Sequence, residues 1–259
     1  MKSWHDIGFE IEITGDQSPS LRILQPVEAH KERGESMHHS GGACAETLLI
    51  YGEPIREVLQ RQKQPSFLIV GLGLGYIEMV IARESLLAQK AVARITSYES
   101  VPELRHFFHA WLFENRESLQ TEVAKTYDLV AEHVLQGTSL NPFEIREFLR
   151  GHFPELSSLQ GALNSDLSPQ RGSSAHCILY DAFSSKTSPH LWEEEFLCEF
   201  LRLYAEPAYC VLSTYACRGT LKRALAREGF AVKVREGFQG KRNSTLALRE
   251  RDEFIKTKV

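Results

Sequence analysis

The sequence predicts an α/β fold with a mostly parallel sheet, a β-hairpin extension at the N-terminus and an antiparallel hairpin at the C-terminal end. Three observations support this prediction. Short continuous apolar runs, such as residues 66–70, are typical of strands buried on both faces of a parallel sheet. Segments with helical spacing alternate with these runs, as in βαβ units. The last two β-branched runs are separated by a short glycine-containing linker, which suits an antiparallel hairpin.

The first 35 residues are expected to form the hairpin extension. Residues 7–13 alternate apolar and polar side chains, turn-forming residues follow, and residues 20–24 return as the partner strand. The main domain is expected to span residues 36–259. It begins with two short helical pieces within residues 44–61, because Gly-Glu-Pro at positions 52–54 interrupts the helical spacing.

A βαβ unit comes next, with strands at 66–70 and 93–98 around a helix that includes Ile77. Residues 103–155 look mostly helical and contain an insertion at about 114–155. Five further strands are expected, at 156–163, 176–180, 209–213, 231–235 and 245–248. Two further helices are expected: one begins with Ser188 as N-cap and Pro189 at its first position, and the other spans about 220–228 and ends at Gly229.

The composition is that of an ordinary globular protein of 259 residues, 42% hydrophobic and 25% charged, which excludes disorder and a disulfide-built miniprotein. Five cysteines without a Cys-x-x-Cys pair are expected to be reduced. The N-terminus lacks a signal-peptide apolar run, and the longest apolar stretch, 66–82, is interrupted by three glycines and Glu78. We therefore expect a cytoplasmic protein without a membrane segment.

Charge is unevenly distributed along the chain, whose net charge is −4. Residues 218–259 contain 12 Lys/Arg and 5 Asp/Glu, whereas residues 1–217 contain 18 and 29. Such a basic segment could contact nucleic-acid phosphates, or it could be ordinary surface charge without a partner.

Three glycines at alternate positions, Gly71, Gly73 and Gly75, follow the strand at 66–70 directly. Without a Cβ atom the backbone can approach a ligand closely, and the N–H groups of the following helix can face an anionic group. The dinucleotide fingerprint Gly-x-Gly-x-x-Gly would need a glycine where Tyr76 stands. The pattern therefore disfavours NAD and suits S-adenosylmethionine, whose one anionic group is a carboxylate.

Two acidic residues each follow directly after a strand of the predicted sheet. Glu99 follows the strand at 93–98 and could accept hydrogen bonds from both ribose hydroxyls. Asp181 follows the strand at 176–180 and should face the same crevice, where a carboxylate can hold a substrate amine and accept its proton. A solvated strand-end acid and a loop cap are the respective alternatives.

Several motifs occur in the C-terminal half: Asp181-Ala-Phe-Ser, Pro189-His-Leu-Trp192-Glu, Leu212-Ser-Thr-Tyr215-Ala, Glu228-Gly-Phe230 and Glu236-Gly-Phe238-Gln-Gly-Lys241-Arg242. With the segment 35–46, they resemble the methyltransferase domain of the bacterial bifunctional enzyme that makes 5-methylaminomethyl-2-thiouridine in tRNA, and its stand-alone relatives. The resemblance covers roughly residues 35–110 and 175–248, and the terminal Gly-Phe-x-Gly-Lys-Arg is its most specific part.

The resemblance implies a class I (Rossmann-like) methyltransferase fold, S-adenosylmethionine as cofactor, and methylation of the amine of 5-aminomethyluridine at the tRNA wobble position. It implies that Gly71, Gly73, Gly75 and Glu99 bind the cofactor, and that Asp181 is the catalytic residue between cofactor and amine. We place the adenine-contacting strand end at Ala162 and Asn164. Ser40, Lys241 and Arg242 are expected near substrate or tRNA, and the chain has no room for the flavin oxidase half of the bifunctional enzyme.

Two other functions are compatible with the same residues: methylation of a small-molecule amine, and a catalytically silent nucleotide- or RNA-binding module. His38, His39, Cys44 and Glu46 fit no standard zinc spacing, so we expect no metal and favour a loop near substrate. Trp192 is expected to be a packing anchor rather than a platform for base stacking.

Overall fold

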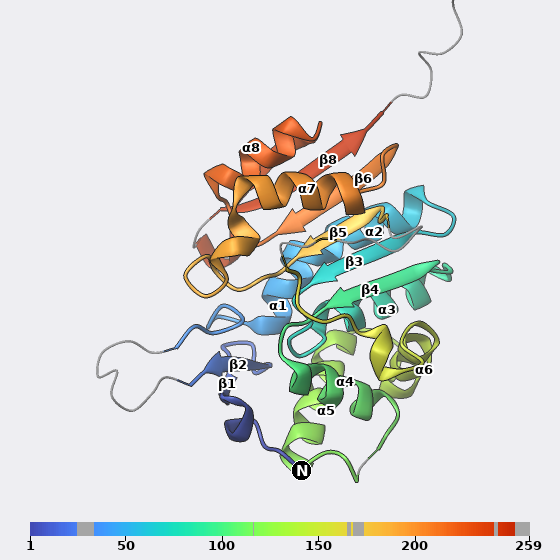
Figure 1. Ribbon diagram of the computed structural model, residues 1–259. Helices are drawn as coiled ribbons and strands as arrows, with labels where there is room; N and C mark the ends of the chain where they lie inside the picture. The colour runs from blue at the N-terminus through green and yellow to red at the C-terminus, as the bar shows by residue number, and fades with distance from the viewer. Residues whose placement is uncertain (25–33, 116, 165–166, 168–173, 241–242, 252–259) are drawn as a thin grey trace, which may run out of the picture.

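The computed structural model describes residues 1–24, 34–115, 117–164, 167, 174–240 and 243–251. At its centre lies a six-stranded sheet in the order β4-β3-β5-β6-β8-β7 (Figure 1). The strands are β3 (Ser66–Val70), β4 (Arg94–Tyr98), β5 (Cys177–Tyr180), β6 (Tyr209–Thr214), β7 (Ala231–Arg235) and β8 (Ser244–Glu250). The first four strands are parallel, and β8 pairs antiparallel with both β6 and β7. The predicted fold class is confirmed.

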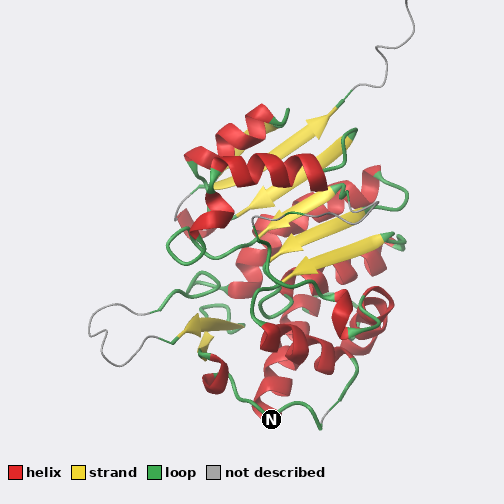
Figure 2. Cartoon of the chain, viewed as in Figure 1, coloured by secondary structure: helices red, strands yellow, loops and turns green. Residues whose placement is uncertain are grey.

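Helices cover both faces of the sheet (Figure 2). Phe67 and Ile69 of β3 belong to one buried cluster, and Leu68 and Val70 belong to another, as the two-residue period of a strand requires. The first cluster includes residues of α1 (Ala43–Thr47), η2 (Leu48–Gly52), α2 (Glu53–Arg61), α3 (Tyr76–Ala88), α4 (Pro102–Leu112), α5 (Thr121–Leu135) and α6 (Pro142–His152), and the second of α7 (Glu194–Tyr204) and α8 (Gly219–Arg227). Among the described residues, no helix is long and apolar enough to cross a membrane.

The N-terminal hairpin consists of β1 (Phe9–Ile13) and β2 (Pro19–Ile23), which pair antiparallel as predicted. Its turn is tied to the main domain. The side chains of Thr14, Ser18 and Asp16 accept hydrogen bonds from the first three N–H groups of α1, at 3.0, 2.9 and 2.9 Å. These N–H groups have no partner within the helix, so the hairpin caps α1 from a distant part of the chain.

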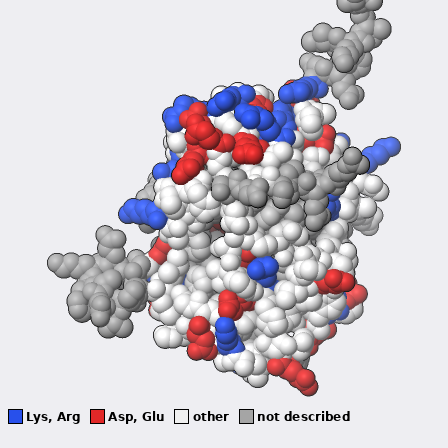
Figure 3. All heavy atoms as spheres, viewed as in Figure 1, with Lys and Arg blue, Asp and Glu red and all other residues white. Residues whose placement is uncertain are grey.

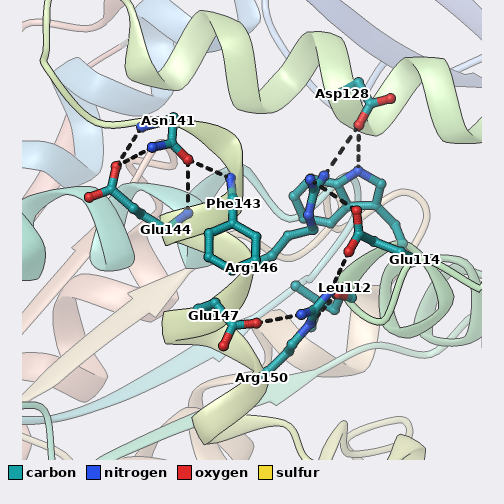
Figure 4. A network of polar contacts seen from close by, with 10 residues as sticks. Leu112, Glu114, Asp128, Asn141, Phe143, Glu144, Arg146, Glu147 and Arg150 are labelled. Atoms are coloured by element: carbon teal, nitrogen blue, oxygen red, sulfur yellow. Dashed lines mark hydrogen bonds and ion pairs between the residues drawn. The ribbon is translucent and has the colours of Figure 1, made fainter.

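Helices α5 and α6 are joined to the end of α4 by polar contacts that involve Asp128, Arg146 and Glu114 (Figure 4). The indole Nε1 of Trp111 donates to Asp128 of α5 at 2.9 Å, and Arg146 of α6 lies 3.6 Å from the same carboxylate. Arg146 and Arg150 also pair with Glu114, at 3.4 and 3.1 Å. These contacts fix α5 and α6 to the end of α4.

The predicted strand at 156–163 is wrong. Residues Leu156–Ser158 form a 3-10 turn, in which the Ser158 hydroxyl accepts from the backbone N–H of Glu155. Such local side-chain hydrogen bonds compete with a strand ladder. One parallel bridge remains, in which Gln160 donates to the Ser97 carbonyl at 2.9 Å and accepts from the Glu99 N–H at 3.1 Å. The segment therefore still follows the free edge of β4.

Ser188 lies at the N-cap position and Pro189 at the first position of a helical turn, as predicted, but the Ser188 side chain makes no capping hydrogen bond. Pro189–Trp192 form a short 3-10 turn (η4), and α7 begins only at Glu194. Trp192 is 3% exposed, and its Nε1 donates to the Phe183 carbonyl at 2.7 Å. This contact fixes the turn in its place, and it confirms Trp192 as a packing anchor.

Candidate active site

A cavity of 540 Å³ opens where β3, β4 and β5 end. Its walls contain the loop after β3, residues 98–100 after β4 and residues 181–184 after β5. Parallel strands bring their carboxyl ends to one edge of a sheet, so these distant segments meet there. The other walls come from residues 35–39, from α1 and η2, from residues 162–164, and from Tyr215 and Phe238.

The glycine loop has a left-handed backbone at each of its three glycines, with φ of 99° at Gly71, 52° at Gly73 and 74° at Gly75. A Cβ atom on Gly71 would lie 2.5 Å from the Asp181 carbonyl oxygen. Gly71 and Gly73 line the cavity. Gly75 does not; a Cβ there would lie 2.3 Å from the Phe108 ring, so this glycine permits close packing at the start of α3.

Glu99 is oriented by the backbone around it. Its carboxylate accepts hydrogen bonds from the Gly73 N–H at 3.0 Å and from the Val101 N–H at 2.9 Å. Its side chain is buried, which raises its pKa, while these backbone donors lower it. The Ser100 hydroxyl also donates to this carboxylate at 3.4 Å, and because a carboxylate has about four acceptor sites, acceptor capacity remains for a ligand hydroxyl.

Asp181 lies in the cavity wall beside a tyrosine. The Tyr51 hydroxyl donates a hydrogen bond of 2.6 Å to Oδ1 of Asp181. Burial raises the pKa of Asp181 to about 7, with the Tyr51 hydrogen bond acting in the opposite direction and the charge of Glu46 adding to the rise. Near neutral pH this carboxyl can therefore both accept and release a proton.

The segment around Glu35 is held against the loop after β5. The Glu35 carboxylate accepts from the Ser184 N–H at 2.8 Å, from the Ser184 hydroxyl at 3.0 Å and from the Thr187 hydroxyl. Two residues later, the Met37 sulfur would lie 3.2 Å from a Cβ atom on Gly73. The N-terminal segment thus forms a wall between the glycine loop and the Asp181 loop.

The cavity is acidic. Four carboxylates line it: Glu35, Glu46, Glu99 and Asp181. Among the lining residues that the structure describes, there is neither a Lys nor an Arg. Such a cavity favours cationic ligands and disfavours phosphate groups.

The remaining predicted site residues have different placements. Ala162 and Asn164 line the cavity, beside Leu163. Ser40 is exposed, its carbonyl accepts from the Gly15 N–H at 2.8 Å, and it is not part of the lining. Lys241 and Arg242 lie outside the described residues.

Glu35, Glu46 and Tyr51 line the cavity but were not among the predicted site residues. Glu35 and Glu46 lie in the N-terminal motif at 35–46, and this motif could have identified them as site residues. Tyr51 belongs to an apolar helical stripe, which is indistinguishable from ordinary core in sequence.

His38, part of the same motif, contacts the hairpin rather than a metal site. Its Nδ1 is hydrogen-bonded to the Ser20 hydroxyl at 3.0 Å, and burial lowers its pKa to about 4. No cluster of three or more metal-binding side chains occurs in the described part of the chain.

Comparisons with known proteins agree with this geometry. A family described as S-adenosyl-L-methionine-dependent methyltransferase matches residues 155–250. The tRNA 5-methylaminomethyl-2-thiouridine biosynthesis bifunctional protein MnmC of Aromatoleum aromaticum is 26% identical over 211 residues. That match covers 81% of this chain and 32% of the relative, so the chain spans about a third of the relative's length. The C-terminal part of the chain thus matches an S-adenosylmethionine-dependent methyltransferase family, and most of the chain is similar to part of MnmC.

Two further comparisons extend this result. MnmC of Burkholderia mallei (strain SAVP1) is 34% identical over 77 residues, 30% of this chain and 11% of the relative. The crystal structure of MnmC2 from Aquifex aeolicus has a TM-score of 0.62 and 23% identity, and the match covers 93% of this chain and 69% of that one. The latter shows the same fold.

The residues that line the cavity fit S-adenosylmethionine as a cofactor. The molecule carries a sulfonium and an ammonium, and the cavity lining is acidic without a described cation. The loop at Gly71 and Gly73 leaves backbone free of side chains at the cavity, and the Glu99 carboxylate is oriented for hydroxyl groups. These three residues would hold the cofactor.

Proposed function

We propose that this methyltransferase methylates the primary amine of 5-aminomethyluridine at the wobble position of tRNA. The observation that carries the proposal is the pairing of an acidic cavity with Asp181, a carboxylate in its wall whose pKa lies near neutrality. The name of the related protein MnmC refers to tRNA 5-methylaminomethyl-2-thiouridine biosynthesis, and it supports tRNA as substrate. A tRNA-modifying role also favours the cytoplasm as its location.

The chemistry follows from the charge of the substrate. An alkyl amine is protonated near pH 7 and has no free electron pair for attack. In the proposed mechanism Asp181, in its ionised form, takes one proton from the substrate ammonium. The nitrogen lone pair can then form the N–C bond.

Bound S-adenosylmethionine supplies a methyl group on a positively charged sulfur, which keeps the electron pair of the broken S–C bond. The product leaves as a secondary ammonium, and Asp181 releases its proton to solvent, so charge and atoms balance. Asp181 and the walls around it contribute mainly by holding the amine in line and by removing its proton.

The RNA backbone must remain outside the cavity, because the described lining is acidic. Figure 3 shows Lys and Arg side chains gathered over α8 and the neighbouring end of β8, with acidic side chains among them. Arg218, exposed at the start of α8, lies with its Cζ 5.8 Å from the Trp192 ring. Tyr215, three residues earlier, lines the cavity. We propose that Arg218 contacts tRNA phosphate, together with Ser40, Lys241 and Arg242.

The test compares three substrates with the purified protein: tRNA carrying 5-aminomethyluridine, the same tRNA with unmodified uridine, and the free 5-aminomethyluridine nucleoside. We expect methyl transfer only to the first, with log kcat/KM falling linearly with log salt. Salt-independent methylation of the nucleoside would indicate a small-molecule enzyme. Cofactor binding without any methyl transfer would indicate a silent module.

Charge-reversal variants test the proposed RNA surface. Arg218→Glu should raise the KM for tRNA several-fold and reduce the salt dependence, with the affinity for S-adenosylmethionine unchanged. Lys125→Glu, at an exposed position of α5, is the matched control and should leave the KM unchanged. Equal effects of both variants on the KM for tRNA would show that Arg218 does not belong to the RNA-binding surface.

A further inference from the structure

We propose that Tyr51 is a positioning residue for Asp181, and that the π-helical turn η2 holds its hydroxyl on one oxygen of that carboxylate. The inference rests on the proposed function in one respect, because it takes Asp181 as the group that accepts the amine proton. It adds a residue that neither the sequence motifs nor the comparisons single out.

The contact between the two side chains fixes which oxygen is available. Tyr51 is 2% exposed, lines the cavity, and donates to Oδ1 of Asp181 at 2.6 Å. A tyrosine hydroxyl has one proton to donate, and here it is directed at Oδ1. Oδ2 is therefore left to receive a proton from the substrate, and the plane of the carboxylate is set before substrate binds.

The backbone around Tyr51 explains how the hydroxyl is held. Leu48–Gly52 form a single π-helical turn between α1 and α2. Such turns occur frequently at functional sites, and they leave backbone groups to be paired outside the helix. The carbonyl of Ile50 accepts from the Ser213 hydroxyl at 2.7 Å and from Arg235 Nη2 at 3.2 Å.

These two donors also contact each other, because Arg235 Nη2 lies 2.8 Å from the Ser213 hydroxyl. Ser213 is fully buried on β6, and Arg235 lies on β7 at the edge of the sheet. The Ile50 carbonyl and the Ser213 hydroxyl are both paired in this network, whereas Nε and Nη1 of Arg235 are buried without a hydrogen-bond partner among the described residues. The turn that carries Tyr51 is in this way attached to the antiparallel end of the sheet.

Four titratable groups among the described residues interact electrostatically with Asp181. They are Tyr51 of η2, Glu46 of α1, Tyr215 after β6 and Glu78 of α3. The Tyr215 hydroxyl donates a hydrogen bond of 2.8 Å to the Ala182 carbonyl oxygen. The Tyr51 hydrogen bond lowers the pKa of Asp181, whereas the charge of Glu46 raises it. Substitutions at positions 51 and 46 should therefore move the Asp181 pKa in opposite directions.

A carboxyl-carbon NMR titration of the full chain, labelled with ¹³C at aspartate, tests the inference without any substrate. The sequence contains six aspartates, and Asp181→Asn identifies the signal of interest. A hydrogen bond to a charged group corresponds to about 1–2 pH units, so Tyr51→Phe should raise the Asp181 pKa by this amount. Glu46→Gln should lower it. Ser213→Ala should raise it by less than Tyr51→Phe.

Tyr204→Phe is the matched control, because it removes a tyrosine hydroxyl that lies outside the cavity and is hydrogen-bonded to Tyr98 at 3.2 Å. Its Asp181 titration should equal that of the wild type. An unchanged or lowered Asp181 pKa in Tyr51→Phe would overturn the inference. So would a rise in the Tyr204→Phe control equal to that in Tyr51→Phe.

The pH profile of methyl transfer provides the second readout. In Tyr51→Phe, kcat should fall about tenfold at pH 7 and recover at higher pH, with the KM for S-adenosylmethionine within twofold of wild type. A purely structural role would lower kcat equally at every pH and would contradict the inference. If wild type fails to methylate tRNA, the proposed function fails while the titration still tests Tyr51. If tRNA is methylated and the titration does not shift, the inference alone fails.

Discussion

The two sides of the cavity are built in different ways. The side proposed to hold the cofactor, which we call the cofactor side, comes mainly from residues 66–99, a continuous stretch of β3, α3 and β4, and backbone N–H groups orient its acid, Glu99. The side next to Asp181 comes from residues far apart in sequence: Tyr51 and Asp181 are 130 positions apart, and Glu35 and Ser184 are 149 apart. In this proposal, cofactor binding depends on local backbone conformation, whereas the chemistry depends on long-range side-chain contacts.

Asp181→Asn should show the largest difference between the two sides, because it should lower kcat strongly and leave cofactor affinity nearly unchanged. The amide keeps the size of the carboxyl group but cannot take a proton from an ammonium, so kcat should fall by about 10²- to 10⁴-fold. The dissociation constant of S-adenosylmethionine, measured by calorimetry, should stay within a few-fold of wild type. Equal losses in kcat and cofactor affinity would instead assign Asp181 to cofactor binding alone.

Gly71→Val should act on the cofactor side. The added Cβ would lie 2.5 Å from the Asp181 carbonyl oxygen, at a φ of 99° that side-chain-bearing residues rarely adopt. Strain of a few kcal/mol predicts cofactor binding weakened on the order of 100-fold, with a lower melting temperature. Gly151→Ala is the control, because it lies within α6 and has no atom within 4 Å of an added Cβ. Wild-type affinity in Gly71→Val would show that the loop does not touch the cofactor.

Glu99→Gln should have a smaller effect, confined to the cofactor side. The variant loses the negative charge. Its NH₂ group would point at the N–H of Gly73 or Val101, each of which donates to the carboxylate in the wild type. Cofactor affinity should fall about tenfold, while kcat at saturating cofactor stays near wild type. A fall in kcat without loss of affinity would connect Glu99 to the reaction instead.

Asn141→Ala should leave both sides unchanged. Asn141 caps α6 by accepting from the N–H groups of Phe143 and Glu144, at 3.0 and 3.2 Å (Figure 4). Loss of an N-cap typically costs about 1 kcal/mol, so thermal unfolding should shift by a few degrees with cofactor affinity and kcat preserved. A change in kcat would connect α6 to the active site.

The sequence predicted well what is encoded locally. β3 and β5 are buried on both faces, so their apolar runs were unambiguous, and the glycine loop with Glu99 follows from its position after a strand. The strand expected at 156–163 was wrong because serine and glutamate side chains pair with nearby backbone, which a hydrophobicity pattern does not reveal. Gly75 was expected to bind cofactor, but the structure places Phe108 against it.

The contacts across the cavity could not be predicted from sequence. Tyr51 has the apolar spacing of a helix that packs on a core, and its contact with Asp181 depends on a π-helical turn and on a donor from β7. Glu35 lies in the N-terminal motif, but its hydrogen-bond partners, Ser184 and Thr187, come 149 and 152 positions later in the sequence. Such pairings follow from the order of strands in the sheet, so they become visible only once that order is known.

The central claim is that one cavity holds S-adenosylmethionine with its reactive sulfur facing Asp181. A crystal structure with the product S-adenosylhomocysteine tests this most directly. We expect the ribose hydroxyls on the Glu99 carboxylate, the amino-acid part along Gly71 and Gly73, and the sulfur turned toward Asp181. Product bound at another surface, or in this cavity with its sulfur turned away from Asp181, would contradict the account.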